Sequence, residues 1–132
     1  MTWKVSFRIM SATLDPSEVT LMLGIEPDFE HRAGAPVGSA FSRAPSKFKE
    51  GIWALESDIA DTHTLERHIT GLIARLGNVG ESLSRLRWRG YRIDFFAGLF
   101  EAEDNVGVEL SSDTLRAIAD LSASLSLDLY AV

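Results

Sequence analysis

The chain has 132 residues, no cysteine and a net charge of −6. This length is typical of one domain with its own hydrophobic core, and we expect residues 1–132 to form a single domain. The absence of cysteine excludes disulfides and thiolate metal sites, and no apolar run approaches the roughly 18 residues that a membrane span needs. Net negative charge disfavours general nucleic-acid binding, which depends on neutralising phosphates. Because the N-terminus also lacks a signal-peptide pattern, we expect a cytoplasmic protein without membrane association.

The beginning of the chain predicts a strand followed by a helix. Apolar and polar residues alternate between residues 3 and 9, which predicts a strand whose buried face is made of Trp3, Val5, Phe7 and Ile9. The helix that follows has three signals: Asp15 can cap its N-terminus, Pro16 fits its first turn, and Gly24 can end it.

The middle of the chain combines an irregular segment with a pair of helices. Residues 26–51 contain three prolines and three glycines, and an irregular segment of this length is usually functional or mobile. A short strand is predicted at residues 52–57. Periodic apolar residues then predict a helical pair within residues 62–89. The first helix is expected to begin at Asp61 or Thr62, and Asn78 is expected to cap the second.

Residues 91–110 are predicted to form a β-hairpin at the centre of the fold. The first run is rich in aromatic residues, and the second alternates Val106, Val108 and Leu110 with Gly107 and Glu109. An acidic loop connects the two runs. A last helix, capped by Ser111 or Ser112, and an alternating strand complete the chain. The inward residues of that strand are expected to be Leu125, Leu127 and Leu129.

This order of elements predicts an α+β fold. We expect a mainly antiparallel sheet of about five strands with helices on one face. Without the helical pair at residues 62–89, which we treat as an elaboration, the order is that of a ferredoxin-like β-α-β-β-α-β core.

Several short motifs, taken in order, also carry a family resemblance. After the opening strand come Leu14-Asp15-Pro16-Ser17-Glu18, Leu23-Gly24-Ile25-Glu26-Pro27, Gly34, Trp53 with Leu55 and Ser57, Gly90-Tyr91 and the closing Leu127-Asp128-Leu129-Tyr130. With these motifs the chain resembles the bacterial domain-of-unknown-function family numbered 4279 over nearly its whole length. The resemblance implies a small stand-alone bacterial α+β domain. It implies no reaction, so no catalytic residue is carried over.

Charge is unevenly distributed along the chain, and this is the main clue to function. Residues 101–132 contain seven acidic residues and one basic residue, a local charge of −6, whereas residues 30–50 contain four basic and two acidic residues. The acidic third favours a non-enzymatic protein-binding module, such as an immunity-like neutraliser of a basic partner protein. The expected contact residues are Glu101, Glu103 and Asp104, on the loop of the predicted hairpin.

Two alternatives remain open. The first is a small-molecule or anion-binding domain that uses the basic 30–50 segment, with His31, Arg32 and Lys47 as ligand-binding residues. The second is an enzyme of unknown type. The five-residue spacing of His63 and His68 does not place them on one helical face, so it does not indicate a metal site. No sequence pattern of a cofactor site or of a catalytic site is recognised either. We therefore predict no catalytic residue, no metal site and no cofactor.

Overall fold

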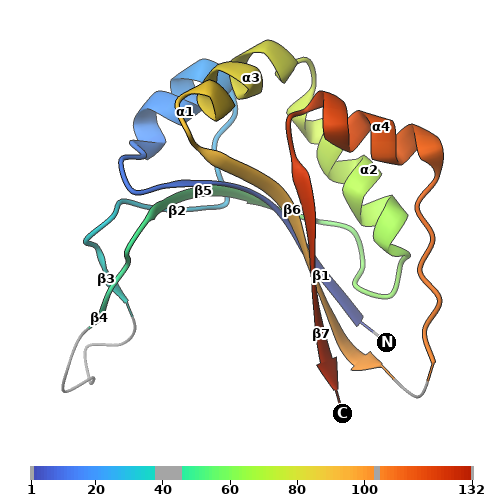
Figure 1. Ribbon diagram of the computed structural model, residues 1–132. Helices are drawn as coiled ribbons and strands as arrows, with labels where there is room; N and C mark the ends of the chain where they lie inside the picture. Colours follow the sequence, from blue (N-terminus) through green and yellow to red (C-terminus); the bar gives the residue numbers. More distant parts are fainter. Residues whose placement is uncertain (1, 38–45, 103–104, 132) are drawn as a thin grey trace.

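The computed structural model describes residues 2–37, 46–102 and 105–131 (Figure 1). Its elements, in chain order, are β1 (Thr2–Ser11), α1 (Pro16–Leu23), β2 (Phe29–His31), β3 (Pro36–Val37), β4 (Ser46–Lys47), β5 (Gly51–Glu56), α2 (Leu65–Leu76), α3 (Gly80–Trp88), β6 (Arg92–Ala102), α4 (Ser112–Asp120) and β7 (Ser124–Ala131).

The main sheet is mixed and has the order β2-β5-β1-β6-β7. Neighbouring strands are antiparallel except for β6 and β7, which are parallel. Figure 1 shows a curved sheet whose convex side is covered by the helices and whose concave side is open. This arrangement confirms the predicted α+β class with helices on one face. The ferredoxin-like description stays a prediction. The strands that α1 joins, β1 and β2, have β5 between them, and the strands that α2 and α3 join, β5 and β6, have β1 between them.

The core lies between the sheet and the helices. The four apolar residues of β1 are buried as predicted, since alternation along a strand sends every second side chain to the same face. At the centre Phe7 contacts Phe95 and Trp53, with ring centroids 5.2 Å and 6.5 Å apart. From α2 the apolar stripe Leu65, Ile69, Leu72 and Leu76 packs into the same core. Full burial of one such side chain stabilises the fold by roughly 1.5–3 kcal/mol.

The predicted hairpin is wrong. Residues 105–111 have no regular structure, and Val108 is 44% exposed. Strand β6 pairs instead with β1 on one side and with β7 on the other. The alternation has a different cause: Val106 and Leu110 pack against the core from an extended segment whose backbone joins no sheet. Val108 has the same phase as these two residues and is exposed, so a period of two identifies neither every side chain that faces the core nor the pairing partner.

The last strand also differs from expectation. Leu125 packs against the core, but Leu127 and Leu129 are 49% and 65% exposed. Figure 1 shows the reason, because β7 is an edge strand whose C-terminal half runs past the helices that cover its beginning.

Most helix boundaries follow the predicted capping residues. The Asp15 side chain accepts a hydrogen bond from the Ser17 backbone N–H, and Gly24 ends α1 in the left-handed conformation with φ 70°. Ser111 caps α4 as predicted. Two boundaries were wrong: Thr64, rather than Asp61 or Thr62, caps α2, and Asn78 does not cap α3. Within residues 26–51, β2 joins the main sheet, and β3 and β4 form a small second sheet.

Candidate functional site

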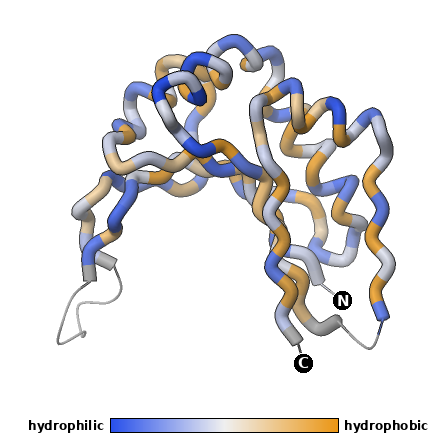
Figure 2. The backbone as a smooth tube through the Cα atoms, in the orientation of Figure 1, coloured by the Kyte–Doolittle hydropathy of each residue, from blue (hydrophilic) through white to orange (hydrophobic). Residues whose placement is uncertain are grey.

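Exposed apolar side chains concentrate in the C-terminal third of the chain. Five of the eight large apolar side chains that are exposed among the described residues belong to it: Val108, Leu115, Leu127, Leu129 and Tyr130. They lie on the extended segment 105–111, on α4 and on β7, which Figure 1 places at one end of the molecule. Figure 2 shows apolar and polar residues alternating along segment 105–111. We call the exposed side chains of residues 105–130 the C-terminal surface.

The C-terminal surface carries more acidic than basic side chains, so its negative charge is not balanced. Its acidic residues are the exposed Glu109, Asp113 and Asp120, to which we add the half-buried Asp128 of β7, and its one basic residue is Arg116. Arg116 donates to Asp113 over 3.3 Å, but both side chains are mostly exposed, so this pair is weak. The Asp128 carboxylate accepts a hydrogen bond from the Tyr130 hydroxyl at 2.7 Å, which raises the pKa of Tyr130. Four acids and one base leave a local charge of −3.

The acidic residues that sequence reasoning selected adjoin this surface along the chain. Glu101 belongs to β6, one residue before its end, whereas Glu103 and Asp104 lie outside the described residues. Glu109 continues the acidic composition on segment 105–111. The structure shows that the segments after these residues also expose apolar side chains, which a count of charges does not reveal.

The residues of the alternative anion site are only partly brought together. The His31 ring stacks on Phe48, with centroids 3.4 Å apart, and Phe48 follows Lys47 of β4. The Arg32 guanidinium points elsewhere and donates to the Asp15 carboxylate at 2.8 Å. The same carboxylate also caps α1. Arg32 therefore pairs with an anionic group that is already part of the fold.

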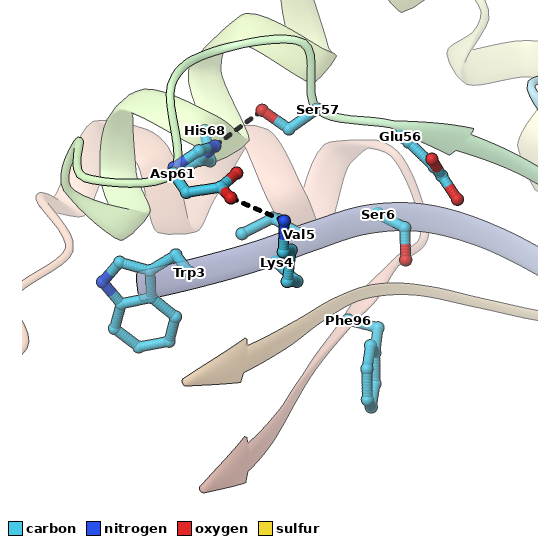
Figure 3. Close-up of a pocket in the computed structure, with 9 residues that line it drawn as sticks. All are labelled: Trp3, Lys4, Val5, Ser6, Glu56, Ser57, Asp61, His68 and Phe96. Atoms are coloured by element: carbon cyan, nitrogen blue, oxygen red, sulfur yellow. Dashed lines mark hydrogen bonds and ion pairs between the residues drawn. The ribbon is translucent and has the colours of Figure 1, made fainter. Parts of the chain in front are cut away.

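Sequence reasoning missed a pocket of about 250 Å³ beside β1 (Figure 3). Strand β5 leaves β1 after Glu56, and the following loop completes the edge of β1 through two backbone bonds, from Ser57 N–H to the Val5 carbonyl and from Trp3 N–H to the Asp61 carbonyl. The hollow that opens there is lined by Lys4, Ser6, Phe96 and, from the loop and α2, Ser57, Asp61 and His68.

Inside this pocket Ser57 and His68 form a close pair. The Ser57 hydroxyl lies 2.6 Å from Nδ1 of His68, whose side chain is 1% exposed. Burial lowers the pKa of His68, and this effect outweighs the nearby Asp61 carboxylate, which raises it. The sequence carried one usable signal, because His68 falls on the apolar stripe of α2, three residues after Leu65 and four before Leu72.

The pair does not have the organisation of a catalytic relay. A serine nucleophile needs a base that a third group orients through its other nitrogen. Nε2 of His68 is buried without a hydrogen-bond partner in the part of the chain that the structure describes. The Asp61 carboxylate is instead bound to the Lys4 ammonium group at 2.5 Å (Figure 3). The hydrogen bond between Ser57 and His68 instead joins the loop after β5 to α2.

The open side of the sheet carries a second polar cluster that was missed. Asp94 was expected on the polar face of its strand, and it lies there, yet it is buried. Its carboxylate accepts two bonds from Arg8 and one from the Ser126 hydroxyl at 2.9 Å, while the Arg8 guanidinium lies over the Phe96 ring. Both carboxylate oxygens of Asp94 accept hydrogen bonds, from β1 and from β7, so the cluster holds three strands together.

The described residues contain neither a metal-binding cluster nor a membrane-spanning helix. No group of three or more histidine, aspartate or glutamate side chains is arranged to hold a metal ion in residues 2–37, 46–102 and 105–131. Over the same ranges, no helix combines the length and the hydropathy that crossing a bilayer requires.

Comparison with known proteins agrees with the motifs quoted above. Residues 1–132 match the family model described as "Domain of unknown function (DUF4279)". No curated protein and no solved structure matches the chain significantly. Because the family model spans the whole sequence, the chain belongs to the DUF4279 family.

Proposed function

We propose that this chain is a non-enzymatic protein-binding module that binds a basic partner at the C-terminal surface, as an immunity-like neutraliser would. The observation that supports this proposal is the coincidence of exposed apolar side chains with uncompensated acid on the same three segments. Contiguous exposed apolar groups mark interaction sites in soluble domains, and polar or charged groups at their rim select the partner.

The two kinds of side chain would contribute at different stages of binding. Exposed carboxylates raise the rate at which a basic partner is captured, and salt screens this effect. Apolar side chains such as Leu127 and Leu129 then lose contact with water when the partner docks, which slows dissociation. The absence of cysteine supports a reducing bacterial cytoplasm as the location.

The test uses the partner that crosslinks to the intact protein, with association measured at low and at moderate ionic strength. Two acidic-surface variants are compared with the unchanged protein: Glu101→Gln with Glu103→Gln and Asp104→Asn, and Glu109→Gln with Asp120→Asn. A control variant removes three acids from the N-terminal half of the chain, Glu26→Gln with Glu30→Gln and Asp58→Asn. At low salt we expect either acidic-surface variant to slow association about tenfold, and the control to change it little.

The anion-binding alternative predicts a different pattern. An association rate that is unaffected by the acidic-surface variants, together with loss of binding on Arg32→Ala or Lys47→Ala, would reject the proposal. In that case the basic 30–50 segment, with His31 stacked on Phe48, becomes the preferred site.

A further inference from the structure

We infer that the basic partner binds by adding a β-strand to the free edge of β7. This inference rests on the proposed function and specifies it further, because it names the element that is contacted and the kind of partner segment that fits. An extended segment in which basic and apolar residues alternate would extend the main sheet by one strand. Strand addition of this kind gains affinity from main-chain hydrogen bonds and specificity from alternate side chains.

The outer edge of β7 has unused main-chain groups. Strand β7 (Ser124–Ala131) is the last strand of the sheet order and, among the strands that the structure describes, pairs only with β6. Within the described parts of the chain, no backbone hydrogen bond reaches its outer side. Natural proteins commonly protect such edges with lysine, proline or a covering element. The sequence of β7, Ser-Leu-Ser-Leu-Asp-Leu-Tyr-Ala, has neither lysine nor proline.

The edge is also held in a fixed conformation before any partner arrives. The Ser126 hydroxyl donates to the buried Asp94 carboxylate at 2.9 Å, and Tyr130 stacks on Phe100 with ring centroids 4.4 Å apart. Both contacts join β7 to β6 on the open side of the sheet. A strand that is already ordered loses little conformational entropy on binding, so it is a favourable template.

The two faces of β7 define the pattern of the incoming strand. Leu127 and Leu129 are exposed on the helix-covered side, and Asp128 and Tyr130 lie on the open side. Because residues opposite each other on neighbouring strands interact directly, the partner should place apolar side chains beside the two leucines. It should place a lysine or arginine beside Asp128.

Charge favours a different protein over a second copy of this chain as the occupant. Two copies of β7 could pair antiparallel about Leu127, which would set Asp128 opposite Ser126. That pairing would also bring together two C-terminal surfaces, each with its own exposed Glu109 and Asp113, from chains of net charge −6. Like charges at an interface oppose association, whereas a basic strand is attracted.

The experiment uses the whole protein and a synthetic probe, an acetylated octapeptide in which valine alternates with lysine. Binding and the hydrogen exchange of β7 amides are followed together by NMR. We expect saturable binding that weakens with salt, and slower exchange at every second amide of β7, because alternate N–H groups of an edge strand point outward. Two control peptides should not bind: one with N-methylated alternate residues, and one with glutamate in place of lysine.

Matched variants locate the contact on the protein. Leu127→Lys with Leu129→Lys should weaken binding of the probe at least about tenfold, whereas Leu21→Lys, at an apolar position 84% exposed on α1, should not. Failure of the probe to bind, or binding without slower exchange in β7, overturns strand addition and leaves the proposed function intact. A dimer in sedimentation that the leucine variant abolishes would instead identify a second copy as the occupant. The proposed function fails separately, if the crosslinked partner associates independently of the acidic residues.

Discussion

Arg8 and Asp94 face each other across β1 and β6 and share two hydrogen bonds, from Nε to Oδ1 at 2.9 Å and from Nη2 to Oδ2 at 2.7 Å. Both side chains are largely withdrawn from water, and the Arg8 guanidinium also lies 4.3 Å from the centroid of the Phe96 ring. With Ser126 bound to the same carboxylate, one buried charge connects three adjacent strands.

Removing Asp94 should therefore cost more than removing an acid from an exposed pair. Asp94→Ala leaves Arg8 charged, partly buried and without its partner, and we expect a loss of about 3 kcal/mol in the free energy of unfolding, measured with urea. The control is Glu81→Ala, which breaks an exposed pair on one helix with Arg85 and should change stability by no more than about 0.5 kcal/mol. If the two variants lose the same free energy of unfolding, the Arg8–Asp94 pair stabilises the fold no more than an exposed pair does.

Truncation of Phe95 tests the position of the core. Phe95 is fully buried against Phe7, so Phe95→Ala should lower the free energy of unfolding by about 3–5 kcal/mol. Val108→Ala should have little effect, because Val108 lies on the extended segment and is exposed. A denaturation midpoint that does not move for Phe95→Ala contradicts the register of β6.

Asp15 has two roles that can be separated by mutation. Its carboxylate caps α1 through the Ser17 N–H at 3.0 Å and also pairs with Arg32. Asp15→Ala should cost about 0.5–2 kcal/mol, mostly from the lost cap. Arg32→Gln removes only the exposed ion pair, and it should cost less than about 1 kcal/mol. If Arg32→Gln proves as costly as Asp15→Ala, the cap is not the source of the stability.

His68 should make stability depend on pH on the acid side of neutrality. Burial lowers its folded-state pKa below the ordinary 6.5, so below about pH 6.5 the unfolded chain binds a proton that the folded chain does not. The free energy of unfolding should therefore be highest above pH 6.5 and should fall as the pH drops through the folded-state pKa.

The control for this pH dependence is removal of the titrating group itself. His68→Gln should flatten the slope between neutral pH and the folded-state pKa. A slope that survives His68→Gln would assign the titration to another group.

The sequence predicted the features that depend on near neighbours. The cap at Asp15, the end of α1 at Gly24 and the buried face of β1 each follow from a few adjacent residues, and all were confirmed. The pairing of β6 was missed because nothing within residues 91–110 states that its partners are the first and the last strands. For the same reason Leu127 was assigned to the core, since alternation cannot reveal where a covering helix stops.

The same distinction between local and distant features applies to the candidate site. An acidic C-terminal third was visible as a count of charges, but exposed apolar side chains such as Leu115 could be recognised only after the helices were placed. The pairs Arg8–Asp94 and Ser57–His68 each join separate elements, so no local sequence pattern predicts them.

The central place of β1 in the sheet has a consequence for the kinetics of folding. Its neighbours are β5 and β6, and pairs such as Ser6 with Glu56 and Thr2 with Phe100 close large loops before any strand hydrogen bond is gained. Chains dominated by such distant contacts fold in milliseconds to seconds, well after their helices can form. Until β6 arrives, one edge of β1 has no partner strand and is open to aggregation. The rate of folding should therefore be set by the meeting of β1 and β6.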